Sequence, residues 1–203
     1  MIKVYGSPRS SAGRTFWTLE EAGVPYENMP LNMKNKEHKS PEFLKINPNG
    51  KVPAMIDGDL ILFESMAINF YLAETYKKDL LGETPRENGL IHQWSFWALS
   101  ELQPPIIEVF IQKVFVPEPQ RNQATIDKNM AALPGLFSIL DNALAKTKYL
   151  SGTEFSLADI NTASVAMLAS AIGFDTKPYA NINRWFGAIS DRPAYQKYSA
   201  LLA

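Results

Sequence analysis

The spacing of hydrophobic residues changes near residue 80. Before that point, short apolar runs rich in β-branched and aromatic residues alternate with segments of helical spacing. The order is strand, helix, strand, loop, strand, strand, helix, at residues 2–6, 11–23, 24–33, 34–50, 51–57, 60–64 and 65–78. This order predicts a small mixed α/β sheet with helices on it.

Two turn signals support these boundaries. Gly23 follows the first helical stretch, and glycine is the usual residue at a helix C-terminus. Asp57-Gly58-Asp59 separates two strand-like runs and is typical of a hairpin turn. The loop at residues 34–50 is polar and rich in Pro, Asn and Gly, with room for one short helix.

After residue 80 the pattern predicts helices and no convincing strand pair. We expect one domain at residues 1–79, a linker at 80–86 and an all-helical domain at 87–203. The long helices are predicted at residues 87–115, 120–146 and 156–172, followed by two short ones near the end.

Three prolines and one cap modify this helical pattern. Pro104-Pro105 falls inside the first long helix and Pro134 inside the second, which predicts kinks or breaks because proline removes a helix hydrogen bond. Ser156 and Asp159 fit a capping box at the start of the third, and we expect a structural role for them.

The composition is ordinary for a soluble globular protein. Of 203 residues, 46% are hydrophobic and 20% charged, and the formal net charge is -1. Such a charge gives no reason to expect binding to nucleic acid or to an anionic membrane. No apolar run is long enough to cross a bilayer, and the first residues do not fit a secretory signal, so we expect a cytoplasmic protein.

The chain contains no cysteine, which excludes disulfides, thiolate zinc sites and cysteine nucleophiles. The two histidines, His38 and His92, lack the paired spacing of metal ligands. We therefore expect no bound metal.

A series of motifs resembles the glutathione S-transferase family. The stretch Tyr5-Gly6-Ser7-Pro8-Arg9-Ser10, with Arg14 four residues on, is similar to the active-site start of serine-type members, particularly the phi and theta classes. The other motifs, in register along nearly the whole chain, are Glu37-His38-Lys39, Phe43-Leu44, residues 47–54, Asp57-Gly58-Asp59, Leu62-Phe63-Glu64-Ser65, Ala67-Ile68, Tyr71-Leu72, residues 156–159 and Arg192-Pro193.

This resemblance implies a thioredoxin-like βαβ–ββα domain that binds glutathione, followed by an all-helical domain, in a homodimer. The implied activity is transfer of the glutathione thiolate to electrophilic apolar substrates, with reduction of organic hydroperoxides as a variant. Two other functions stay open: a non-catalytic scaffold or carrier of glutathione or apolar ligands, and a glutathione-dependent isomerase, which the Ser10-Ser11 pair raises.

Ser10 is the residue to which the resemblance assigns the glutathione sulfur. A free cysteine thiol has a pKa of ~8.5, and lowering it by two units requires about 2.7 kcal/mol of preferential stabilisation of the anion. A hydroxyl hydrogen bond and a helix N-terminus together can supply this. Serine before a helix is also a common cap, and the two roles are compatible. Ser11, Ser7 and Tyr5 are rivals, Ser11 the nearest, and we expect a structural role for Arg14.

The rest of the glutathione site is assigned by the same resemblance. Glu64-Ser65 lies between a strand and a helix, where free N–H groups and Ser65 can bind the γ-glutamyl carboxylate while Glu64 accepts from its ammonium group. The Val52-Pro53 peptide is expected to be cis, with the backbone N–H and C=O of Val52 facing the cysteinyl unit, although propensity alone favours a trans proline at the start of a strand.

Basic residues are the candidates for the glycine carboxylate. These are His38, Lys39 and Lys51, in a loop that also carries Lys34, Lys36 and Lys45. A basic rim would concentrate an anionic tripeptide. Lys51 replaces the glutamine usual in the phi class. For the second substrate, the candidates are Arg9, Met33, Phe110 and Phe115, although most aromatic residues at helical spacing belong to a core.

Overall fold

The structure is a computed structural model that describes residues 1–202 and divides into two compact units. The first unit comprises Met1–Leu81 together with the segment from Ser190 onward, and the second comprises Gly82–Ile189. The division between Leu81 and Gly82 lies within the expected linker at 80–86. The segment from Ser190 belongs to the first unit, whereas the expected limits of 87–203 included it in the second.

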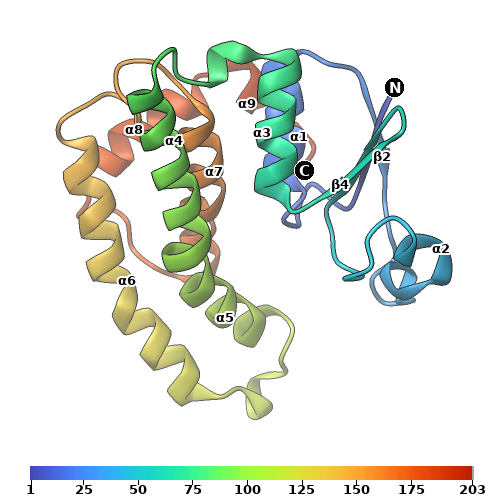
Figure 1. The fold of residues 1–203 in the computed structure, drawn as a ribbon. Helices are drawn as coiled ribbons and strands as arrows, with labels where there is room; N and C mark the ends of the chain where they lie inside the picture. Colours follow the sequence, from blue (N-terminus) through green and yellow to red (C-terminus); the bar gives the residue numbers. More distant parts are fainter. Residues whose placement is uncertain (203) are drawn as a thin grey trace. The chain divides into compact units, whose positions relative to one another are not determined.

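The first unit contains a four-stranded mixed sheet in the order β2-β1-β3-β4 (Figure 1). The strands are β1 (Ile2–Tyr5), β2 (Tyr26–Met29), β3 (Ala54–Asp57) and β4 (Leu60–Phe63). β1 is parallel to β2 and antiparallel to β3, and β3 is antiparallel to β4. This is the βαβ–ββα arrangement that the sequence predicted.

Three helices of the first unit pack together: α1 (Gly13–Ala22), α3 (Ser65–Tyr76) and α9 (Pro193–Ala200). α1 ends at Gly23, whose φ of 66° is the left-handed conformation expected of a glycine cap. The Asn69 side chain of α3 donates to the Arg14 carbonyl of α1 at 3.3 Å. The expected loop carries a 3-10 turn, Glu37–Lys39, and one short helix, α2 (Pro41–Leu44).

The second unit is helical. Its helices are α4 (Pro85–Trp97), α5 (Gln103–Val114), α6 (Gln123–Leu144), α7 (Leu157–Ala166) and α8 (Ala180–Ser190), with 3-10 turns at Glu118–Gln120 and Met167–Ile172. α7 is almost entirely buried. Its polar side chains are paired: Asn161 donates to the Ser95 hydroxyl and Thr162 to the Trp94 carbonyl. Among residues 1–202, no helix is both long and apolar enough to span a bilayer.

The prolines interrupt the helices less than expected. The predicted helix at 87–115 is continuous, but just before Pro104-Pro105 it widens into one π turn, Ala98–Leu102, between α4 and α5. The two prolines then occupy the first turn of α5, where proline is tolerated. α6 continues through Pro134 without a break, so the proline there costs the helix a hydrogen bond but does not end it.

Asp159 closes the predicted capping box at the start of α7. Its carboxylate accepts from the Ser156 N–H at 2.9 Å, the Leu150 N–H at 3.0 Å and the Trp185 indole N–H at 2.8 Å. Burial raises the pKa of Asp159 to about 6, and the hydrogen bonds from Leu150 and Ser156 oppose this rise. One carboxylate thus joins α7 to α8 and to the preceding loop.

Replacing this carboxylate should destabilise the second unit strongly. We expect Asp159→Ala to lower the free energy of unfolding by about 3–5 kcal/mol, because three buried donors lose their acceptor. Urea unfolding would measure this loss, with the exposed Glu154→Ala as the control. Equal effects of the two substitutions would contradict the prediction.

Candidate functional site

The strand register brings three of the predicted site segments to one edge of the sheet. Ala54 pairs with Tyr5 of β1 on one side and with Phe63 of β4 on the other. In an antiparallel ladder, the residue before one partner lies next to the residue after the other. Gly6, Pro53 and Glu64 therefore form the next row at the end of the sheet. This row joins the Ser10 turn, the Val52-Pro53 peptide and the start of α3.

Gly6 allows the Ser10 turn to approach Val52. Its φ is +138°, and a Cβ built on it would lie 2.8 Å from Ala12 Cβ, 3.2 Å from Val52 Cβ and 3.5 Å from Ser10 Oγ. The Ser10 hydroxyl and the Val52 side chain thus lie around the same point. The absence of a side chain at Gly6 leaves room for both.

The Ser10 hydroxyl makes two hydrogen bonds within its own turn. It donates to the Ser7 carbonyl at 2.7 Å and accepts from the Ala12 N–H at 3.2 Å. Since α1 begins only at Gly13, Ser10 caps the turn that leads into the helix and not the helix itself, which corrects the expected cap. The hydroxyl hydrogen must leave the Ser7 carbonyl before it can be donated elsewhere.

The three alternative donors to the glutathione sulfur, Ser7, Ser11 and Tyr5, have different environments from Ser10. The Ser7 hydroxyl accepts from the Arg9 N–H at 3.3 Å, and the Ser11 side chain is exposed. The Tyr5 ring packs against Phe43 of α2, with ring centroids 5.7 Å apart, as expected of an aromatic residue on a strand. The structure therefore brings Ser10 beside Val52 and gives Tyr5 a packing role.

The Val52-Pro53 peptide bond is cis, as the resemblance implied, and Pro53 is buried. Asn47, to which the sequence analysis gave no role, organises the chain before it. Its side chain, only 2% exposed, donates to the Lys51 carbonyl at 2.7 Å and accepts from the Asn49 N–H at 3.1 Å. This buried amide stabilises the turn that places Val52 at the end of the sheet, just before β3.

Glu64 and Ser65 form the start of α3. Glu64 has φ +70° and ψ 109°, a conformation that a non-glycine residue rarely adopts and that is typically held at functional sites. Ser65 is the first residue of the helix and only 7% exposed. The first N–H groups of a helix have no carbonyl partner within it, so an anion can bind here.

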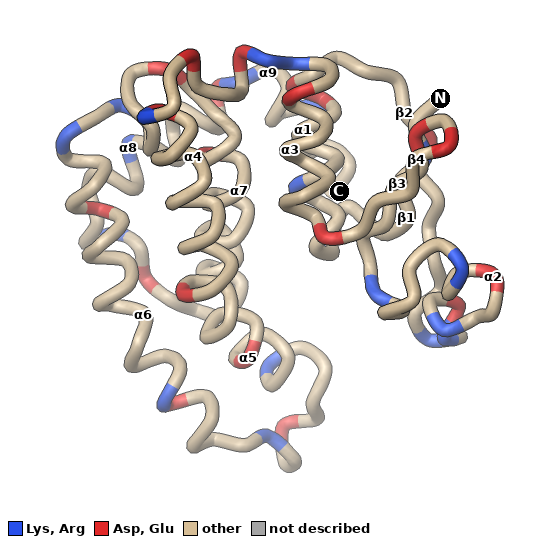
Figure 2. Tube along the Cα trace, viewed as in Figure 1, with Lys and Arg blue, Asp and Glu red and all other residues tan. Residues whose placement is uncertain are grey.

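The basic candidates lie in the loop around α2, where Figure 2 shows a concentration of lysine positions. The Lys39 ammonium group donates to the Asn49 carbonyl at 3.0 Å and lies across Gly50. Because an ammonium group has three donors, two remain for an anion. The Lys51 side chain is exposed, and His38 Nδ1 is buried without a hydrogen-bond partner among residues 1–202.

Tyr198 of the last helix, α9, contacts Arg14 and Pro8 near the Ser10 turn, and the sequence did not predict this. The Arg14 guanidinium, 5% exposed, lies near Tyr198 of α9. Burial lowers the pKa of Arg14 to about 10, and Tyr198 partly offsets this fall, so Arg14 remains a cation at neutral pH. The Tyr198 hydroxyl donates to the Pro8 carbonyl at 3.5 Å. No local pattern could indicate contacts between residues so far apart in the chain.

The four candidates for the second substrate are divided between the two units. In the first unit, the Arg9 guanidinium donates to the Leu202 carbonyl and Met33 is 49% exposed. In the second unit, Phe110 and Phe115 form an edge-to-face pair with centroids 5.9 Å apart, and Phe115 is 71% exposed. The acceptor pocket itself stays a prediction. In the described part of the chain, no group of three or more His, Asp or Glu side chains could hold a metal.

Comparison with known proteins identifies similar families and structures. The family models "Glutathione S-transferase, N-terminal domain" and "Glutathione S-transferase, C-terminal domain" match residues 1–74 and 102–193. Glutathione S-transferase 1 of Zea mays is 35% identical over 207 residues, which cover 99% of this chain and 97% of the relative.

Two solved structures are similar over nearly the full length. One is the theta class glutathione S-transferase of Xanthomonas axonopodis pv. citri with glutathione bound, with a TM-score of 0.90 and 32% identity over 97% of this chain and 95% of that chain. The other is glutathione S-transferase I from maize in complex with an atrazine glutathione conjugate, with a TM-score of 0.87 and 35% identity over 98% and 97%.

Gly6→Ala tests whether the close approach at the sheet edge matters for activity. We expect kcat/KM to fall roughly 10- to 100-fold, because a Cβ would clash with Ala12 at 2.8 Å and press against Val52 at 3.2 Å, which shifts the turn that carries Ser10. Gly152→Ala is a matched control: its φ is +150°, close to that of Gly6, but a Cβ there meets nothing within 4 Å. This control should lose some stability and keep activity within about twofold. Equal losses of activity would show that backbone strain alone is responsible.

Proposed function

This chain belongs to the glutathione S-transferase family, and on that premise we propose that the Ser10 hydroxyl holds the sulfur of bound glutathione as a thiolate. The observation that carries the proposal is the position of Ser10 Oγ beside Gly6 and Val52, at the end of the sheet. A rival serine, Ser11, has an exposed side chain. The protein is an enzyme that transfers glutathione to electrophilic substrates.

The charged ends of glutathione have complementary groups around this position. We assign the γ-glutamyl carboxylate to Ser65 and the N-terminus of α3, and the γ-glutamyl ammonium group to Glu64. The backbone of Val52 pairs with the cysteinyl unit, next to the cis Pro53. These contacts anchor the tripeptide on both sides of its sulfur.

The glycine carboxylate is assigned to the basic loop. Lys39 is held in place by the Asn49 carbonyl and keeps two donors, and Lys51 and His38 belong to the same loop. The lysines there also raise the local concentration of an anionic ligand. The loop therefore contributes both a direct contact to the glycine carboxylate and a positive electrostatic potential that attracts glutathione.

Stabilisation of the thiolate is the chemical task of the site. Lowering a thiol pKa from ~8.5 by two units takes about 2.7 kcal/mol, and a hydroxyl donor with a nearby helix N-terminus accounts for this amount. The Ser10 hydrogen turns from the Ser7 carbonyl to the sulfur, while its oxygen keeps the Ala12 N–H. The thiol proton passes to solvent before the attack.

In the transfer step, the sulfur lone pair forms a bond to an electrophilic carbon, and a leaving group departs with its bonding electrons. Ser10 is a hydrogen-bond donor in this step and never the nucleophile. The maize relative holds an atrazine glutathione conjugate. This supports the proposal that the present protein also acts on apolar electrophiles. Apolar contacts discriminate weakly between such substrates, so we propose a broad specificity.

Replacement of single serines tests the proposal. We expect Ser10→Ala to lower kcat for a generic aromatic electrophile roughly 10- to 150-fold, because a hydrogen bond to a charged sulfur is lost. Affinity for glutathione should change less than about threefold, because the charged ends remain anchored. Ser11→Ala is the control and should leave both quantities unchanged. Steady-state kinetics measures kcat, and calorimetric titration with glutathione measures the affinity.

Two outcomes would contradict the assignment. A loss confined to Ser11→Ala would move the role by one residue. Tight binding of glutathione by wild type with no turnover of any electrophile would instead favour the scaffold function, since an intact site would then serve only for binding.

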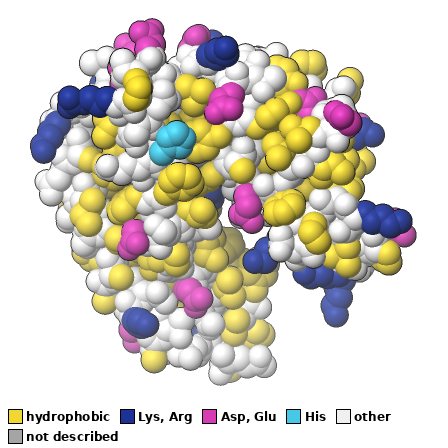
Figure 3. All heavy atoms as spheres, in the orientation of Figure 1, with side chains coloured by type: hydrophobic (Ala, Val, Ile, Leu, Met, Phe, Trp, Pro, Cys, Tyr) yellow, Lys and Arg dark blue, Asp and Glu magenta, His cyan; other side chains and the backbone are white. Residues whose placement is uncertain are grey.

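We also propose that the protein works in the cytoplasm as a homodimer. Hydrophobic side chains reach the surface over α4 in Figure 3, and Phe96 of that helix is 55% exposed. A second copy of the chain would remove such surface from water. Light scattering after size-exclusion chromatography should give twice the mass of 22.7 kDa, whereas a monomer mass at micromolar concentration would contradict the dimer.

A further inference from the structure

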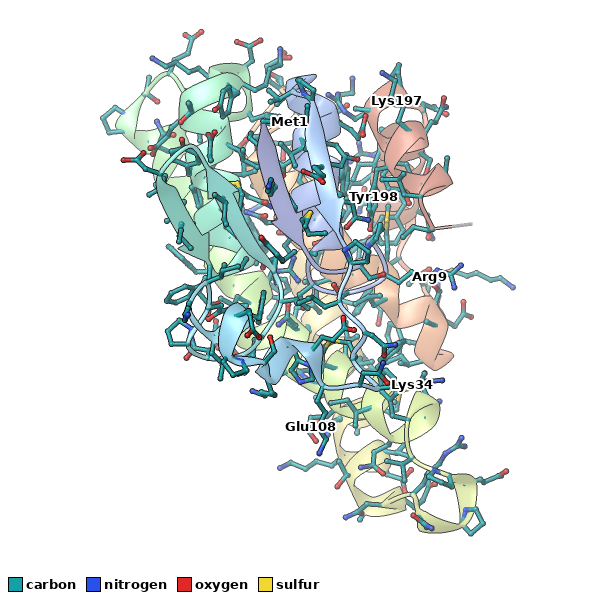
Figure 4. All side chains as sticks on the ribbon, turned by 90° about the vertical axis from the view of Figure 1, so that its right-hand side faces the viewer. Met1, Arg9, Lys34, Glu108, Lys197 and Tyr198 are labelled. Atoms are coloured by element: carbon teal, nitrogen blue, oxygen red, sulfur yellow. The ribbon has the colours of Figure 1, made fainter. Side chains whose placement is uncertain are left out.

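The last helix of the chain reaches the turn that carries Ser10. Tyr198 of α9 donates a hydrogen bond from its hydroxyl to the Pro8 carbonyl oxygen at 3.5 Å, although 190 residues separate them in the sequence. Figure 4 shows Tyr198 where α9 lies alongside α1. Both ends of this contact belong to the first unit. The hydrogen bond from Tyr198 to Pro8 and the hydrogen bond from Ser10 to Ser7 therefore lie within the same four-residue turn.

Gly13 shows how closely the Tyr198 hydroxyl fits. A Cβ built on Gly13, the first residue of α1, would lie 2.6 Å from Tyr198 Oη and closer still to the Pro8 carbonyl oxygen. The hydroxyl thus occupies the junction between the turn and the helix. Only a residue without a side chain leaves room for it there.

Other contacts determine the position of α9 independently. Arg192 forms a bidentate ion pair with Glu21 of α1, with distances of 2.8 and 2.7 Å. The Tyr198 ring lies parallel to the Trp17 ring, with centroids 5.9 Å apart, and Tyr195 meets Trp17 edge-on at 4.9 Å. The Tyr198 hydroxyl is therefore held at Pro8 by the packing of its own ring.

The tail after α9 contacts the same turn. The Arg9 guanidinium donates to the Leu202 carbonyl from Nε at 3.1 Å and from Nη2 at 2.5 Å. Pro8 and Arg9, the two residues directly before Ser10, are thus both joined to the C-terminal segment. This double attachment leaves the turn little freedom to move as a whole.

Burial keeps the Tyr198 hydroxyl protonated and therefore a donor. Arg14 approaches it from α1, and Tyr195 lies on its own helix. Burial, followed by Tyr195, raises the pKa of Tyr198 to about 12, and Arg14 opposes the rise. The phenol therefore keeps its proton at neutral pH.

We propose that Tyr198 is a positioning residue for Ser10: its hydroxyl fixes the Pro8 carbonyl and thereby the turn that holds the Ser10 hydroxyl beside Val52. The inference rests on the proposed role of Ser10. The Ser10 N–H and hydroxyl both bond to the Ser7 carbonyl, at 2.9 and 2.7 Å. A displacement at Pro8, the next residue, moves the Ser7 carbonyl and with it the Ser10 hydroxyl.

Tyr198→Phe tests the proposal, because it removes the hydroxyl and keeps the ring against Trp17. We expect kcat/KM at neutral pH to fall about three- to tenfold. The pKa of bound glutathione, read from the pH profile of kcat/KM and from the ultraviolet absorbance of the thiolate, should rise by roughly half a pH unit to one. Tyr195→Phe, on the same helix and against the same tryptophan, is the control and should change neither quantity.

A double-mutant cycle separates positioning from general stability. If Tyr198 acts through Ser10, Tyr198→Phe should have no further effect on kcat in the Ser10→Ala background. An equal effect in both backgrounds, or a lower melting temperature with an unmoved pH profile, would overturn the positioning role alone. Full activity of Ser10→Ala would overturn the proposed function as well, so the two failures are distinguishable.

Discussion

The pairing of β3 with both of its neighbours is the constraint on which the site depends. Ala54 is bonded in register to Tyr5 and to Phe63, so the residues one step further along the three chains must meet at the end of the sheet. A slip of one residue would reverse every side chain of β3 and separate these segments. The backbone ladder, and not any single side chain, therefore assembles the site.

Around this row the fold adds the field of helix N-termini to the hydrogen bond of Ser10. Two helices begin there, α1 just after the Ser10 turn and α3 at Ser65, and each N-terminus favours an anion. Glutathione as a substrate carries carboxylates and acquires a thiolate, so it suits such an environment. Ser10 adds one directed hydrogen bond to a field that the helices already provide.

The C-terminal segment completes the first unit. Arg192 is paired with Glu21, and the rings of Tyr195 and Tyr198 lie against Trp17, so α9 covers a face of α1 that would otherwise expose a large aromatic side chain. The glutathione-binding unit therefore consists of both ends of the chain. A division of the protein at the linker alone would separate the Ser10 turn from its support.

Local patterns in the sequence by themselves determined the strands, most helices, the Gly23 cap and the Asp159 box, because each depends on residues within a few positions of one another. The cis Val52-Pro53 bond followed from the family resemblance. The π turn before Pro104 and the unbroken helix at Pro134 did not follow, since packing against neighbouring helices decides whether a proline ends a helix. Only the tertiary structure placed Ser10 beside Val52 and brought Tyr198 to Pro8, because strand register and contacts across 190 residues depend on the folding of the whole unit.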